Sequence, residues 1–216
     1  MTRRPAGGSG LYAALSGAYT AIRHLPDRLL HRRRFIEARK RLLALKTVRS
    51  ILVVCHGNIC RSPYLQAVLR RALPAVNVMS AGLVGPDRPV PRHSLTLASE
   101  RGLDLSSFRS CLVSRVDARE IDLVIVMDAD QGRHLTRVFG VSPRRIIIAG
   151  DLDPANSATR EIRDPWRQSL SVFRASFDRL DRIATTIAAL MPYARTASRE
   201  MLSSRRAVLP PHQARL

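Results

Sequence analysis

The chain has 216 residues, a formal net charge of +19 at pH 7 and only three cysteines. So few cysteines argue against a secreted disulfide framework, and no apolar run approaches the roughly 18 residues of a membrane span. The composition therefore predicts a cytoplasmic protein with one domain and extensions.

Positive charge is concentrated toward the amino terminus. Residues 1–49 contain 12 Lys and Arg against 2 acidic residues, net +10, whereas residues 50–192 carry net +5 and residues 193–216 net +4. Nucleic-acid binding is not favoured, because no recognition motif and little aromatic interleaving accompany the basic clusters. An anionic membrane surface, an acidic partner, or a solvated disordered arm each explains this composition.

The first 45 residues include an amphipathic pattern. Leu11, Leu15 and Tyr19 recur at helical spacing, and further apolar residues stand among the arginines downstream. If the arm is functional, residues 11–45 should form interfacial helix on anionic lipid, broken into two helices at Pro26.

Apolar runs alternate with helical patterns through the rest of the chain. This alternation predicts an α/β fold of three layers, α/β/α, in which a four-stranded parallel sheet is covered on both faces. The last helix should bury an apolar stripe that runs from Leu170 to Leu190. Strands are expected near 50–55, 76–80, 122–127 and 145–149, and helices near 63–73, 92–101, 130–139 and 168–190.

The sequence predicts that the first strand is buried and ends in a cysteine that opens a phosphate-binding loop. Residues 51–54 are apolar and mostly β-branched, and the run stops at Cys55. Ser62 is expected to cap the following helix, and Pro63 suits its first turn. Loop amides and the positive end of the helix dipole would then face one space. That environment favours both an oxyanion and a cysteine thiolate.

Three further loop residues suit this chemistry. Arg61 has a planar fork that matches two phosphate oxygens, Gly57 permits close backbone approach, and Asn58 tolerates a left-handed conformation. The pattern predicts thiolate attack on phosphorus. A plain structural alternative makes Cys55 a small core residue and Arg61 a helix-capping or solvated one.

Residues 54–63 match the signature V-C-x-G-N-I-C-R-S-P at every fixed position, so the chain resembles the low-molecular-weight protein tyrosine phosphatases. The resemblance continues at Ser80-Ala81-Gly82, at 121–128 and at Asp164-Pro165, and covers about residues 50–192. It makes 50–192 the phosphatase domain, 1–49 a basic extension that is partly helical or disordered, and 193–216 a basic tail.

A finer resemblance concerns residues 150–169. They are similar to the bacterial branch that dephosphorylates tyrosine autokinases of exopolysaccharide export, where one loop reads D-P-Y-R-x-S. The resemblance implies a phosphotyrosine protein as substrate, with such a kinase as a candidate partner, and a cytoplasmic enzyme that could also sit peripherally at the membrane.

The resemblance assigns catalytic roles to three residues. Cys55 would attack phosphorus and become a phosphocysteine, Arg61 would bind the equatorial oxygens, and Asp164 would protonate the leaving phenolate. No cofactor and no metal is expected. Asp164-Pro165 taken alone could also be an ordinary turn. The substrate-binding set would comprise His56, Gly57, Asn58, Ile59, Cys60, Ser62 and Trp166, with Ser62 donating to the thiolate and Asn58 holding the loop's shape.

Three of these positions have open interpretations. His56 could add a pH-dependent charge beside the phosphate or be a solvated rim residue. Trp166 stands where the family usually has Tyr, and could wall the substrate slot or pack in the core. In similar enzymes the cysteine equivalent to Cys60 can form a reversible disulfide with the nucleophile; here Cys60 could instead be a small buried residue.

Two other functions use the same loop. An arsenate reductase of this fold would need two redox cysteines downstream, and only Cys111 is present there. A non-catalytic oxyanion-binding module would leave Asp164 without a purpose. The sequence therefore favours phosphotyrosine hydrolysis over both.

Overall fold

The fold is built around four parallel strands in the order β2-β1-β3-β4. The computed structural model describes residues 25–45, 47–155, 157 and 159–191. The predicted sheet is confirmed, with each strand within two residues of its expected bounds. The strands are β1 (Ser50–Cys55), β2 (Asn77–Gly82), β3 (Leu123–Val126) and β4 (Ile146–Ile148).

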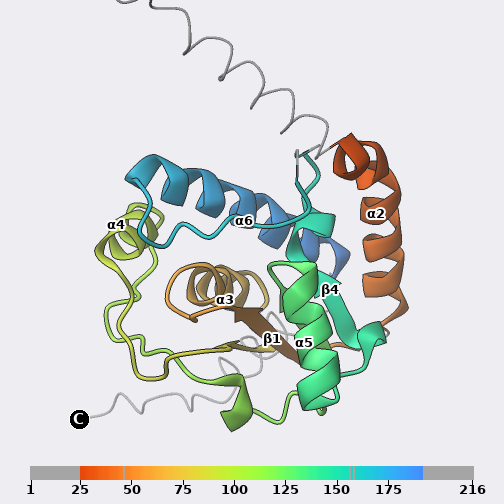
Figure 1. Cartoon of the computed structure of the whole chain (residues 1–216), viewed down its shortest axis with the longest axis horizontal. Coiled ribbons are helices and arrows are strands. Elements are labelled where there is room, and N and C mark those ends of the chain that lie inside the picture. The colour runs from red at the N-terminus through yellow and green to blue at the C-terminus, as the bar shows by residue number, and fades with distance from the viewer. Residues whose placement is uncertain (1–24, 46, 156, 158, 192–216) are drawn as a thin grey trace, which may run out of the picture.

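Helices cover both faces of this sheet, as the predicted three-layer fold requires (Figure 1). Helices α3 (Arg61–Ala72) and α6 (Leu170–Leu190) pack on one face and α5 (Ala129–Phe139) on the other, while α4 (Arg92–Glu100) lies against α6. Short 3-10 helices lie in the connecting segments, at η1 (Val113–Arg115), η2 (Pro143–Arg145) and η3 (Ala149–Leu152).

The apolar run of β1 reflects burial on both faces. Ile51 and Val53 join the core under α3 and α6, whereas Leu52 and Val54 join the core under α5. All four side chains are fully buried, because successive side chains of a strand point to opposite faces and helices cover each face. This double burial fixes Cys55 at the carboxyl end of the central strand β1.

The predicted stripe of the last helix forms most of its inner face. Phe173, Phe177 and Leu180 are buried, as are Ile183 and Ile187. The two ends of the stripe differ: Leu170 is exposed where α6 begins, and Leu190 is only partly buried where it ends.

Part of the basic extension packs on the domain. Helix α2 (Leu25–Ala44) begins one residue before Pro26, and its Ala38 and Leu42 lie in the same core as α6. Arg41 Nη2 donates to the carbonyl oxygens of Pro143 (2.6 Å) and Ile146 (2.8 Å). The upstream half of the predicted interfacial helix lies outside the described residues. Within the described part of the chain, no helix is long and apolar enough to span a bilayer.

A buried carboxylate, Asp153, ties α6 to the segment after β4. It accepts hydrogen bonds from Arg179 Nε and Arg182 Nε, each 2.9 Å long, and from Ser157 Oγ. Burial alone would raise the pKa of Asp153, but the hydrogen bonds from Arg182, Ser157 and the Ala155 N–H outweigh it and lower that pKa. The carboxylate therefore stabilises the fold in its ionised form.

We expect Asp153→Asn to lower the free energy of unfolding at pH 7 by about 3 kcal/mol, because the largely buried Arg179 and the more exposed Arg182 both lose their counter-ion. Since the folded pKa is lowered, this contribution is complete well above the ordinary Asp value near 4 and disappears as pH falls through the folded value. Urea unfolding at a series of pH values measures the difference.

Asp130→Asn is the matched control. Asp130 pairs with Arg133 on the surface, where its side chain is 87% exposed, so its loss should cost less than about 0.5 kcal/mol. Equal losses in the two variants would contradict a stabilising role for the buried cluster.

Candidate active site

The loop at residues 56–60 joins the end of β1 to the first turn of α3, and the end of β2 packs directly against it. Gly82 pairs in register with Cys55. A Cβ atom on Gly82 would lie 2.9 Å from Asn58 Cβ and 3.0 Å from Asn58 N, which is closer than real Cβ contacts. The absence of a side chain at Gly82 therefore allows the loop to close over the strand ends.

Asn58 holds the loop in shape through its side chain. Its backbone is left-handed, with φ at 50°, a conformation that Asn tolerates better than most residues. Nδ2 donates to Ser62 Oγ (2.9 Å) and Ser80 Oγ (2.8 Å), and Oδ1 accepts from the backbone N–H of Cys111 (2.8 Å). One buried amide thus connects the loop, the helix α3, the strand β2 and the segment before η1.

The Cys55 sulfur faces the inside of this loop. Its Sγ lies 3.0 Å from Ser62 Oγ and accepts a hydrogen bond from the backbone N–H of Asn58 (3.2 Å). The interpretation of Ser62 as a helix cap is wrong: α3 already begins at Arg61, and its N-cap residue, Cys60, makes no side-chain cap. The Ser62 hydroxyl instead serves the sulfur and Asn58.

Arg61 lies beneath the site with one donor unused. Nη1 donates to the carbonyl oxygen of Ile162 (2.9 Å), and Nη2 donates to Asp164 Oδ2 (2.5 Å). Its Nε is buried and has no hydrogen-bond acceptor among the described residues. A buried donor without a partner is costly, so this atom is suited to an oxyanion that enters the loop.

Asp164 comes to the site on a loop about a hundred residues away in sequence. The Ile162 N–H donates to the carbonyl oxygen of Met127 (3.0 Å), which fixes this loop to the end of β3. Asp164 Oδ1 accepts from the Trp166 N–H (3.2 Å), and the carboxylate is 41% exposed. The carboxylate therefore stands at the mouth of the loop, within reach of both Arg61 and solvent.

These residues enclose a pocket of about 170 Å³. His56 and Trp166 are exposed at its rim, and Trp166 lies outside both buried cores. Of the predicted site residues, Asn58 and Ser62 support the pocket from below without lining it. The lining residues are Cys55, His56, Gly57, Ile59, Cys60, Arg61, Val84, Arg88, Asp164 and Trp166.

Cys60 is buried beside the reactive loop and is a free thiol, like Cys55 and Cys111. Burial raises the pKa of Cys60 to about 12. Cys60 is therefore protonated at neutral pH and is a poor competitor to Cys55 as nucleophile. A reversible disulfide between Cys55 and Cys60 stays one of the two open interpretations of Cys60.

Arg88 is a pocket residue that the sequence did not indicate. Its Nη2 donates to the carbonyl oxygens of Gly57 (2.8 Å) and Val84 (3.0 Å), and its Nε donates to that of Gly85 (2.9 Å). Arg88 stands in a Gly-Pro-Asp turn among many surface arginines, so no spacing or motif separates it from them.

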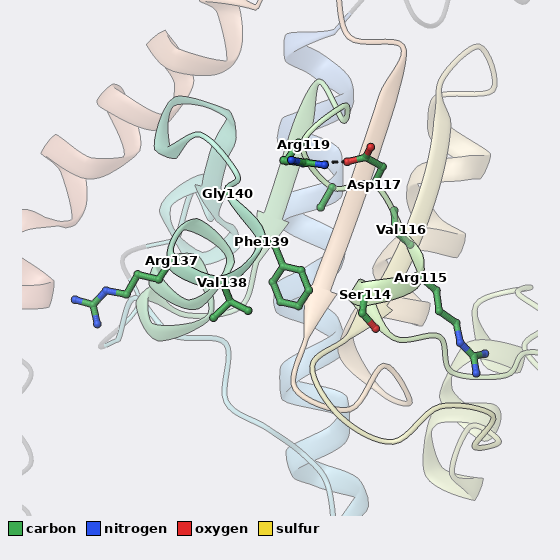
Figure 2. A pocket seen from close by; sticks show the side chains of 10 residues that line it. Ser114, Arg115, Val116, Asp117, Arg119, Arg137, Val138, Phe139 and Gly140 are labelled. Atoms are coloured by element: carbon green, nitrogen blue, oxygen red, sulfur yellow. Dashed lines mark ion pairs between the residues drawn. The ribbon is translucent and has the colours of Figure 1, made fainter.

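A larger hollow, about 660 Å³, lies between residues 114–119 and the end of α5 (Figure 2). Its polar side chains include Arg115, Arg137 and an Asp117–Arg119 ion pair at 3.5 Å. Its lining contains no cysteine that could supply a thiolate and no histidine that could activate the Ser114 hydroxyl. The smaller Cys55 pocket is the candidate active site.

A family model described as low molecular weight phosphotyrosine protein phosphatase matches residues 50–197. The chain belongs to this family. It is a cysteine-dependent protein-tyrosine phosphatase, as the signature at 54–63 predicted, and the arsenate reductase and oxyanion-binding alternatives are not favoured.

Individual relatives agree with the family match. The probable low molecular weight protein-tyrosine-phosphatase EpsP of Ralstonia nicotianae is 31% identical over 136 residues, which cover 62% of this chain and 90% of EpsP. Wzb of Escherichia coli K12 is 36% identical over 141 residues, covering 62% and 90%. The bacterial branch predicted from residues 150–169 is thereby confirmed.

A solved structure has the same fold. Vibrio vulnificus Wzb in complex with benzylphosphonate superposes with a TM-score of 0.59 at 28% identity, covering 66% of this chain and 99% of Wzb. The predicted fold class is confirmed by this similarity and by the parallel sheet.

We expect Arg88→Ala to lower kcat for small aryl phosphates by about tenfold. Arg88 binds the carbonyl of Gly57, and the N–H of that same peptide group, on Asn58, donates to the Cys55 sulfur; a charged donor on the carbonyl strengthens the N–H as a donor. Steady-state kinetics measure the effect.

Arg109→Ala is the control, because Arg109 also donates to loop carbonyls, those of Ser106 and Phe108, but lies outside the pocket. Its kcat should stay within about twofold of the wild type, since exposed side chains remote from a site rarely matter. A similar loss in both variants would count against the contact with Gly57.

Proposed function

We propose that the chain hydrolyses phosphotyrosine at Cys55 through a phosphocysteine intermediate. The observation that carries this proposal is the buried Arg61 Nε, which lacks an acceptor among the described residues and lies in the same side chain as Nη2, the donor to Asp164. Together Nε and Nη2 form a fork for two equatorial oxygens of a phosphate group.

Substrate binding and the first chemical step are coupled through Arg61. A phosphate group on Nε and Nη2 displaces the Asp164 carboxylate from the guanidinium. The displaced carboxylate, now beside the ester oxygen, takes up a proton from solvent. The Cys55 thiolate attacks phosphorus in line, the S–P bond forms, and the P–O bond to the phenol breaks. Asp164 donates its proton to the departing phenolate, while loop N–H groups and Arg61 hold the equatorial oxygens.

The second step regenerates the enzyme. Asp164, now ionised, accepts a proton from a water molecule that attacks phosphorus; the S–P bond breaks and inorganic phosphate is released. The Cys55 sulfur leaves as a thiolate, which the Asn58 N–H and the Ser62 hydroxyl stabilise at 3.2 and 3.0 Å. No step requires a metal ion or a cofactor.

The rim of the pocket suits an aromatic ester. Trp166 is 44% exposed beside the carboxylate, where its indole ring can stack on a phenyl group. His56, on the same rim, adds positive charge near the phosphate when it is protonated. A relative from Vibrio vulnificus binds benzylphosphonate, a phenyl-bearing phosphonate, which supports an aryl phosphate as substrate here.

We further propose that the substrate is a tyrosine autokinase of exopolysaccharide synthesis or export. The Asp164-Pro-Trp-Arg-Gln-Ser segment and the relatives EpsP and Wzb support this choice. Residues 50–192 would supply the catalysis in the cytoplasm, and the basic segments 1–49 and 193–216 would be additions to it, the first of them available to a membrane surface.

Cys55→Ser should abolish turnover but keep phosphate or vanadate binding measurable, because Arg61 and the loop amides remain. Arg61→Lys should lower kcat/KM by at least about a hundredfold, since a point charge cannot replace the bidentate fork. Burst-phase and steady-state assays with p-nitrophenyl phosphate measure both. A Cys55→Ser enzyme with more than a few per cent of wild-type activity would exclude the thiolate mechanism.

Asp164→Asn should slow esters with poor leaving groups by about 10²–10⁴-fold and p-nitrophenyl phosphate much less, because only a basic phenolate needs a proton in the transition state. A leaving-group series measures this slope. Asp87→Asn, which removes a neighbouring exposed carboxylate outside the pocket, should leave the slope unchanged. Equal losses across the Asp164→Asn series would place the general acid elsewhere, and EDTA should not change any rate.

A further inference from the structure

Helix α2 has an apolar row on the side opposite its packed face, and none of the residues that the structure describes covers this row. Ala38 and Leu42 bury its inner side in the core, and Figure 1 shows the helix at the edge of the molecule. Leu29, Ile36 and Leu43 are 73%, 44% and 58% exposed. They are spaced by seven residues, so they line one side of an α-helix over about 21 Å.

Basic side chains accompany this row. Arg32, Arg33, Arg39 and Lys40 are all exposed, and they alternate along the helix with the three apolar residues. The one acidic residue between 29 and 44, Glu37, lines the hollow between α2 and the β4 edge together with Arg33, Arg41 and Arg160. Arg39 lies over the Phe35 ring beside a second hollow, against α6, so Arg33 and Arg39 flank the apolar row on its two sides. We call Leu29, Arg32, Arg33, Ile36, Arg39, Lys40 and Leu43 the outer face of α2.

The positive charge of this chain argues that neither a second copy of it nor its own terminal segments cover the outer face. In a coiled coil built on Leu29, Ile36 and Leu43, the other seam positions would be Arg33 and Lys40, so two copies would place cations against cations. Residues 1–24 contain three arginines and no acidic residue, and residues 193–216 carry net +4. An occupant must therefore be both anionic and able to accept apolar side chains.

We propose that the outer face of α2 docks on an anionic lipid bilayer. The face is a single convex helix surface, whereas a standard protein–protein interface uses about 20–30 residues on each side. A helix lying in the membrane interface has no such requirement, because Leu and Ile side chains enter the acyl boundary while Arg and Lys reach the headgroups. This goes beyond the proposed hydrolysis, since no α2 residue lines the Cys55 pocket.

The geometry fixes how the enzyme would sit. The inner side of α2 is held to the domain by Ala38 and Leu42 and by Arg41, which binds the carbonyls beside β4. The helix therefore docks as part of the folded domain and not as a detached arm. Membrane attachment would raise the local concentration of the phosphatase near phosphoproteins on the same surface.

Sedimentation of the full-length protein with vesicles tests the proposal. Vesicles of phosphatidylcholine with phosphatidylglycerol are compared with vesicles of phosphatidylcholine alone, at low and high salt. The apolar variant is L29S/I36S/L43S and the cation variant is R32Q/R33Q/R39Q/K40Q. The control, R115Q/R119Q/R133Q/R137Q, removes the same number of exposed positive charges from the surface around η1 and α5.

We expect salt-sensitive binding that requires phosphatidylglycerol. Each cation near an anionic surface strengthens binding roughly fivefold, so the cation variant should lose about a hundredfold or more and the control less than about threefold. The apolar variant should also bind at least about tenfold more weakly, because each buried apolar side chain contributes. Hydrolysis of p-nitrophenyl phosphate should be unchanged in all variants, which reports intact folding and is independent of docking.

Three results would overturn the proposal. Failure of the wild-type protein to bind phosphatidylglycerol vesicles would leave an acidic protein as the occupant. Equal losses in the cation variant and the control would mean that net charge, and not α2, drives binding. Full binding by the apolar variant would exclude insertion of Leu29, Ile36 and Leu43.

Discussion

The buried side chain of Asn58 is the constraint on which the active site depends. Its hydrogen bonds to Ser62, Ser80 and Cys111 hold four segments in one arrangement, and its own N–H donates to the Cys55 sulfur. A buried amide with satisfied partners rigidifies its surroundings, because each lost bond would leave a polar atom without water. The loop is therefore set before substrate arrives, and binding does not have to order it.

Arg61 couples phosphate binding to proton transfer by Asp164, because both groups use the same few hydrogen-bond donors of its guanidinium. One donor anchors the Ile162 carbonyl, one binds Asp164, and Nε has no acceptor among the described residues. A phosphate that takes Nε and Nη2 competes with the carboxyl group for the same guanidinium, so the general acid is released when the substrate is in place. The same side chain thus connects the strand end at Cys55 to a loop fixed on β3.

The sequence predicted the strands and helices closely, because each has a strong local pattern. Four apolar residues before Cys55 and the stripe from Phe173 to Ile187 are signals that burial produces directly. The sequence-based prediction was wrong where one residue type suits two different structural roles. Ser62 suits a helix cap by type, but its hydroxyl binds the sulfur because α3 begins one residue earlier.

The sequence by itself determined the parallel sheet and the chemistry at Cys55 and Arg61, which this sheet presents. The spacing of these two residues after a buried strand leaves few other arrangements. Only the tertiary structure decided that Arg88 clamps the Gly57 carbonyl and that α2 keeps an apolar, basic side outward. Both depend on which side of a surface segment meets the domain. No local sequence pattern separates these arginines and leucines from the many others in the chain, and long-range packing alone distinguishes them.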